Sequence, residues 1–316
     1  MRIITKTLLL ATGLALLIGA VWLVRKQPVA AKSESKSVLT STVSKGDEPK
    51  NSTVASSHLD QPNLNTVSAA VRLIVDEQAG YNARLAAIRE AISHLSDADR
   101  QALYTFLLQQ SPLDGDQHNH VLKNMLMDGL CALNPPPTGL GDVLAQLYHD
   151  KSQNVVLRDY AVQHMTALYE ASGNSRNNLS QIRDTLWEAL KETDSSIAGS
   201  ALLGLEQLSK TQSDFDRSRV AKAALQLAGD KDTGELARIT AFQVCAQTGL
   251  QDALPVLEQA AQQGQSIPLR ISAIGALGTM GDAQAVPLLN TLLNGTEERL
   301  KLPAQHALAQ IELKRS

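Results

Sequence analysis

Aromatic residues make up only 3% of this 316-residue chain, and it holds just two cysteines. Such a scarcity of rings disfavours a β-sandwich and suits helices packed with alanine and leucine. The chain also lacks a basic excess, since its formal net charge is −3. Without that excess it cannot neutralise a phosphate backbone, so we do not expect a nucleic acid as its partner. Hydrophobic residues, at 43%, still suffice for a large core.

Several motifs of enzyme chemistry are also missing. None of the seven histidines is followed by glutamate, which excludes the HExxH zinc motif. No nucleophile elbow, phosphate-binding loop or dinucleotide-binding glycine set occurs either. We therefore predict that the chain is not an enzyme. We expect it to have no catalytic residue, no cofactor and no small-molecule substrate.

One pair of histidines, His118 and His120, lies close together after Asp114 and Asp116. Imidazole and carboxylate ligands suit several divalent metals, so a weak metal site is one interpretation. The other is a polar loop that enters a helix. We favour the loop and predict no metal site.

The most informative pattern present is a register of alanines in the C-terminal half. Five alanines recur at intervals of 40, 40, 32 and 31 residues, and an apolar residue follows four positions after each. They are Ala161, Ala201, Ala241, Ala273 and Ala304. Self-similarity over such a period indicates helical repeats that stack on one another.

Basic residues stand three positions before four of these alanines, at Arg158, Arg238, Arg270 and Lys301, with Ala198 in the remaining repeat. They could present a basic ladder to a ligand. They could instead pair with a carboxylate, or with the last carbonyls of a helix in a neighbouring repeat. We favour the second interpretation, because single charges so far apart in sequence do not form a cluster.

The last two full repeats align without a gap over 32 residues. Gly249 and Gly281 are expected to end the first helix of each repeat in a left-handed conformation. Pro255 and Pro287 are expected in the first turn of the second helix, where a missing N–H costs little. Residues 269–289 (LRISAIGALGTMGDAQAVPLL) resemble a HEAT repeat, in the short form found in phycobilin-lyase-like HEAT proteins.

This resemblance implies an all-α fold for residues 66–316: a right-handed α–α superhelix of antiparallel helix pairs, of the armadillo type. Apolar residues at helical spacing predict the same class. Helices are expected at about 154–171, 178–191, 196–209, 215–228, 235–248, 252–263, 268–280, 283–294 and 299–313. Such arrays usually serve as protein-binding scaffolds, so the resemblance implies a protein partner and no particular activity.

Residues 7–24 contain no charge, and as a helix they rise about 27 Å, enough for a hydrocarbon core. This segment could be a signal peptide that is cleaved or a signal anchor that is retained. The sequence favours an anchor over 1–26, because Arg25 and Lys26 separate the apolar run from a cleavage site at Val29-Ala30-Ala31.

The next segment, 27–65, is rich in serine, threonine and lysine and has few large apolar residues, so we predict a disordered linker. A literal count of flanking positive charges would leave the body of the chain in the cytoplasm. A short N-terminal tail more often stays inside, and we therefore favour a membrane-anchored protein whose repeat domain is periplasmic or otherwise extracytoplasmic.

Cys131 and Cys245 would lie about three repeats apart in a stacked array. Helix layers are roughly 10 Å apart, which exceeds the reach of a disulfide. Two free, mostly buried thiols are expected.

A candidate partner surface follows from the family resemblance, because the second helices of HEAT repeats line the concave face. Polar residues at matching positions on two such helices are Glu258, Gln259, Gln262, Asn290, Thr291 and Asn294. They could bind a partner or be plain solvated surface. We expect a membrane-tethered scaffold that binds another protein without catalysis. The alternative is a phycobilin-lyase-like or chaperone-like factor that acts on a protein-bound cofactor.

Overall fold

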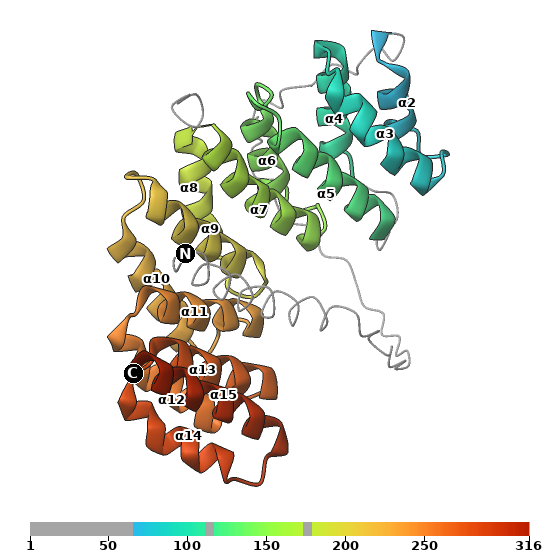
Figure 1. Ribbon diagram of the computed structural model, residues 1–316. Helices are drawn as coiled ribbons and strands as arrows, with labels where there is room; N and C mark the ends of the chain where they lie inside the picture. Colours follow the sequence, from blue (N-terminus) through green and yellow to red (C-terminus); the bar gives the residue numbers. More distant parts are fainter. Residues whose placement is uncertain (1–65, 111–116, 173–178, 316) are drawn as a thin grey trace, which may run out of the picture. The chain divides into compact units, whose positions relative to one another are not determined.

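The computed structural model describes residues 66–110, 117–172 and 179–315. These residues form fourteen α-helices and two short 3-10 helices, with no strand among them, so the all-α prediction is confirmed (Figure 1). No helix of the described ranges is long and apolar enough to span a membrane. The anchor predicted over 1–26 and the linker predicted over 27–65 lie outside the described residues.

The helices are arranged in two layers, because helices of even number contact one another and helices of odd number do likewise. The even layer holds α2 (Ala69–Val75), α4 (Asp97–Leu108), α6 (Leu140–His149), α8 (Leu179–Ala189), α10 (Arg217–Gly229), α12 (Leu254–Gln263) and α14 (Val286–Leu293). The 3-10 helices η2 (Gln251–Ala253) and η3 (Ala283–Ala285) lead into α12 and α14.

The odd layer is continuous from the first described repeat to the last, since each odd helix contacts the next. It holds α3 (Tyr81–Ser93), α5 (Gln117–Cys131), α7 (Val155–Ala171), α9 (Ile197–Thr211), α11 (Glu235–Thr248), α13 (Ile267–Met280) and α15 (Glu298–Arg315). Each odd helix except α5 also packs closely on the even helix before it, which makes stacked helix pairs. The handedness of the predicted superhelix stays a prediction.

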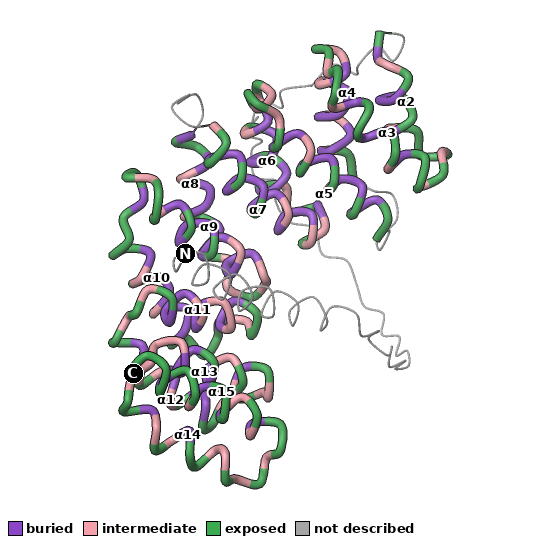
Figure 2. Tube along the Cα trace, in the orientation of Figure 1, coloured by how far each residue is buried: buried purple, intermediate pink, exposed green. Residues whose placement is uncertain are grey.

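The core lies between the two layers, and the alanine register marks it. All five register alanines are fully buried, as are the apolar residues that follow Ala161, Ala201, Ala241 and Ala273 by four positions. Leu308, the fifth, is only half-buried. Figure 2 shows the buried positions along each helix on its inward side. The register is therefore the line along which successive helices bury their apolar faces.

Small residues let neighbouring odd helices approach closely. A Cβ at Gly278 of α13 would lie 2.7 Å from the Cα of Ala307 on α15. A Cβ at Gly204 of α9 would lie 2.1 Å from the hydroxyl of Thr166 on α7. A larger residue at Gly278 would therefore push against the backbone of α15, and one at Gly204 would require the Thr166 side chain to move.

The recurring arginines contact backbone carbonyls at the end of the even helix that precedes them, as one of the two interpretations predicts. The hydrogen bonds run from Nε of Arg158 to Tyr148 (2.7 Å), of Arg238 to Ala228 (3.4 Å) and of Arg270 to Ala261 (2.9 Å). They satisfy carbonyls that a helix end leaves without an intrahelical partner. Lys301 instead pairs with Glu298 of its own helix, at 2.6 Å.

The same device extends into the N-terminal repeats, where the sequence pattern is weakest. Nε of Arg84 on α3 donates to the carbonyl of Ile74 at 2.8 Å, and the fully buried Lys123 on α5 donates to that of Leu107 at 3.1 Å. Arg84 precedes the buried Ala87 by three residues, as the other arginines precede their alanines. The signal was therefore present in the sequence.

The turns between paired helices follow the predicted residues. Gly249 and Gly281 have φ of 66° and 77° and end α11 and α13, and Pro255 and Pro287 lie in the first turns of α12 and α14. Asp282 accepts a hydrogen bond from the amide of Gln284 and caps η3. These short turns fix how each even helix follows its odd partner.

Candidate binding surface

His118 and His120 lie in the first turn of α5, which agrees with a segment that enters a helix, and Asp114 and Asp116 lie outside the described residues. The ring of His118 packs against that of Tyr81 on α3, with centroids 4.6 Å apart. No group of three or more metal-ligating side chains occurs among the described residues. This part of the chain therefore contributes a packing contact between two odd helices.

Both cysteines are free and buried, as predicted. Cys131 lies on α5 and Cys245 on α11, three odd helices further along the array. Burial raises the pKa of both thiols to about 12. Neither sulfur is therefore available as a thiolate nucleophile at neutral pH.

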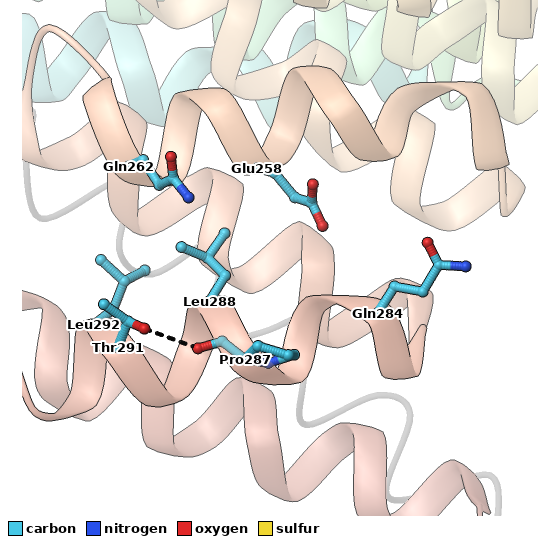
Figure 3. Close-up of a pocket in the computed structure, with 7 residues that line it drawn as sticks. All are labelled: Glu258, Gln262, Gln284, Pro287, Leu288, Thr291 and Leu292. Carbon is cyan, nitrogen blue, oxygen red and sulfur yellow. Dashed lines mark hydrogen bonds between the residues drawn. The ribbon is translucent and has the colours of Figure 1, made fainter.

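The surface of the even layer is hollowed between α12 and α14 into a groove of ≈ 510 Å³. Figure 3 shows side chains from both helices and from η3 directed toward this space. Its lining is Glu258, Gln262, Gln284, Pro287, Leu288, Thr291 and Leu292. The groove combines polar groups on the α12 side with an apolar floor on the α14 side, and we call it the α12–α14 groove.

Three of the six residues predicted from the sequence, Glu258, Gln262 and Thr291, line this groove. Gln259 is exposed on α12 but lies outside the groove lining. The same holds for the remaining two, Asn290 and Asn294 on α14.

Two kinds of polar group can be distinguished within this set. The side chains of Asn290, Thr291 and Asn294 donate to carbonyls one turn earlier in α14, at 2.9 to 3.1 Å. Glu258 and Gln262 make no such bond among the described residues. The groups that remain available to an external partner therefore come mainly from α12.

Sequence reasoning missed four lining residues: Gln284, Pro287, Leu288 and Leu292. Leu288 and Leu292 follow helical spacing and are typical of core positions, yet both remain partly exposed beside the groove. Gln284 lies in η3, a segment predicted as part of the helix over 283–294. Only the placement of α14 against α12 brings these residues together.

A second groove, of ≈ 750 Å³, lies across α6, α8 and the start of α10 in the same layer. Its two aromatic residues are Tyr148 and Trp187, and the other lining residues are charged. These are Lys151, Arg183, Asp184, Glu188, Lys191, Glu192, Asp214, Asp216 and Arg219. We call it the charged groove.

Two carboxylates of the charged groove, Glu188 and Glu192, contact residues of the preceding repeat. Glu192 accepts two hydrogen bonds from Nη2 of Arg158, at 2.6 and 2.8 Å, and pairs with Lys151. Burial opposes its ionisation, but hydrogen bonds from Arg158, Lys151 and Tyr148 outweigh that effect and hold the pKa of Glu192 at about 2. Glu188 lies 3.1 Å from Nε2 of His149. Both carboxylates link neighbouring repeats.

The other end of the charged groove is aromatic. The guanidinium of Arg219 lies over the ring of the half-buried Trp187, 3.8 Å from its centroid. Asp216 accepts from the amide of Ser218 and caps α10, which fixes the helix that carries Arg219. The stacked pair joins α8 to α10 and leaves an amphipathic wall on this side of the groove.

Comparison with known proteins supports the repeat assignment. The family model described as PBS lyase HEAT-like repeat matches residues 269–295, which cover most of α13 and all of α14. No curated protein matches the sequence. A solved structure of human deoxyhypusine hydroxylase in complex with glycerol is similar, with 15% identity and a TM-score of 0.34. That similarity covers 78% of this chain and 95% of the hydroxylase chain.

The prediction that this chain is not an enzyme does not stand. The finding that contradicts it is the similarity to the hydroxylase, which is an enzyme by its name. At this level of similarity, the activity of that protein cannot be assigned to this chain.

Proposed function

Because this chain carries HEAT-like repeats, we propose that it holds another protein on the surface of its even-numbered helices. The observation that carries this proposal is that both grooves, the α12–α14 groove and the charged groove, open on that one layer. They offer polar, charged and aromatic side chains, the mixture that protein interfaces use. In the odd layer, glycine and alanine contacts serve the packing of helix on helix.

The proposal is tested by capture of the partner with groove-blocked and control variants of the full chain. Gln262→Trp fills the α12–α14 groove, and Gln247→Trp places the same ring on an exposed position of α11 in the odd layer. We expect a protein that wild type and Gln247→Trp retain equally and that Gln262→Trp loses. Equal retention by all three would place the contact elsewhere, and no specific protein in any capture would count against the function.

We further propose that residues 7–24 tether the chain to a membrane and that the repeat domain is extracytoplasmic. The support comes from the sequence: an uncharged run of 18 residues with Arg2 and Lys6 before it and Arg25 and Lys26 after it. In a bacterial host, a C-terminal tag should become accessible to protease once the outer envelope is permeabilised. Protection until the inner membrane is lysed would contradict the proposed orientation.

The cofactor-related alternative finds little support in the described residues. Covalent attachment of a cofactor through cysteine would call for a reactive thiol, and both thiols are buried with raised pKa values. Protein binding therefore remains the function that the two grooves support best.

A further inference from the structure

Charge is distributed unevenly around the α12–α14 groove. Residues 251–263 and 282–294, which build η2, α12, η3 and α14, contain three carboxylates and no lysine, arginine or histidine. Arg270 is the single basic residue between Arg238 and Arg299. Its Nε donates a hydrogen bond to the carbonyl of Ala261, near the C-terminal end of α12. The two segments that build the groove therefore carry only negative charges.

Of those three carboxylates, Glu258 is the one that lines the groove. It is half-buried, and none of the described residues donates a hydrogen bond to it or forms an ion pair with it. Figure 3 shows its carboxylate directed from α12 toward α14. A partly buried carboxylate without a counter-charge attracts a cation, and partial burial strengthens that attraction relative to open water.

The facing wall suits an aliphatic side chain. Leu288 projects from α14 toward α12, with Leu292 one turn further along (Figure 3). Both are partly exposed, so a side chain laid on them would bury apolar surface of both partners. The amides of Gln262 and Gln284 lie toward opposite ends of the groove (Figure 3). A side-chain amide both donates and accepts, which matches the N–H and C=O groups of an extended backbone.

We propose, as an extension of the protein-binding function, that the α12–α14 groove binds an extended polypeptide segment that carries a lysine or arginine beside an aliphatic residue. The cation pairs with Glu258, the aliphatic side chain packs on Leu288 and Leu292, and the two glutamine amides bond to the peptide backbone. An acidic residue at the same place is excluded, because Glu258 would repel it.

The test is a selection from a library of random decapeptides displayed on phage, with the immobilised full chain as target. Wild type should enrich peptides with lysine or arginine beside an aliphatic residue. A synthetic version of the most enriched peptide should bind Glu258→Lys about tenfold more weakly than wild type, because one charge of the pair is reversed. In a parallel selection, Glu258→Lys should enrich acidic peptides instead.

The matched control is Glu312→Lys, which makes the same change of charge at an exposed position of α15 in the odd layer. It should leave the affinity for the peptide unchanged. Leu288→Ser should weaken binding while the helical circular dichroism stays as in wild type. The proposal is overturned by selected peptides without basic enrichment, by equal affinity for wild type and Glu258→Lys, or by no enrichment at all. Loss of the captured partner in Gln262→Trp would still support protein binding in each of these cases.

Discussion

Arg158 on α7 holds Glu192, which lies beyond the end of α8, through both carboxylate oxygens at 2.6 and 2.8 Å. The same guanidinium donates from Nε to the carbonyl of Tyr148 at the end of α6. One side chain thus joins α6, α7 and the turn after α8. The arginine side chain is only 8% exposed and that of Glu192 20%, so the pair is shielded from water far better than an ordinary surface ion pair.

Removal of the charge at Glu192 should therefore destabilise the array. We expect Glu192→Gln to lower the free energy of unfolding at pH 7 by about 2 kcal/mol, because it leaves Arg158 buried without its counter-charge. Urea denaturation followed by circular dichroism measures it. The control is Glu298→Gln, whose ion pair with Lys301 is much more exposed and should matter by less than about 0.5 kcal/mol.

The contribution of Glu192 to the free energy of unfolding should also depend on pH. Its pKa is about 2 in the folded chain against an ordinary value of 4.5, so the stabilisation is complete above pH 4.5 and is lost as the pH falls through about 2. The difference in unfolding free energy between wild type and Glu192→Gln should shrink across that window. A difference that stays constant down to pH 2 would show that Glu192 is not held ionised by its partners.

Two glycines one turn apart in α13 should respond in opposite directions to the same substitution. Gly278→Ala would bring a methyl group 2.7 Å from the Cα of Ala307 and should destabilise by about 1–3 kcal/mol through overpacking. Gly275 has no atom within 4 Å of a built Cβ, so Gly275→Ala should stabilise the helix by about 0.5–1 kcal/mol. Thermal melts of both variants check this, and shifts of the same sign would contradict the close approach of α13 to α15.

The alanine register makes a related prediction. Ala273 is fully buried, so Ala273→Leu should lower stability by about 1–3 kcal/mol. Ile271→Leu, at a position 36% exposed in the same helix, provides the control and should change little. An unchanged melting midpoint for Ala273→Leu would mean that the register does not mark the helix crossings.

Both thiols should be unreactive toward thiol reagents in the folded protein. Cys131 and Cys245 are 5% and 0% exposed, and burial raises the pKa of each to about 12. A chromogenic thiol reagent should detect no reactive cysteine in native buffer and two in denaturant. Rapid reaction of either thiol under native conditions would place that residue at the surface.

The repeat architecture could be predicted because its signals are local. Gly249 and Gly281 end helices and Pro255 and Pro287 begin them through interactions within a few residues. Ala241 and Ala273 are buried between helices, and their recurrence at the repeat period reveals them. Helix α5 was harder to predict, since Lys123 takes the place of arginine and no alanine follows it at the expected spacing. Its role appears only once its ammonium is seen at the end of α4.

The candidate surface could be predicted only in part. Glu258, Gln262 and Thr291 are polar at matching helical positions, and all three line the α12–α14 groove. It cannot show that Asn290 and Asn294 bond back to their own helix. Nor can it separate Leu288 at a groove from the fully buried Leu289 beside it, because both are simply leucines of one helix.

Site-specific photocrosslinking in cells would show whether a protein partner lies on the even layer. A benzophenone amino acid would replace Gln262 or Gln284 at the α12–α14 groove, and Gln247 or Gln305 at exposed positions of the odd layer. We expect a discrete covalent product with another protein from the first two positions and none from the second two. A product from the odd-layer positions alone would contradict it.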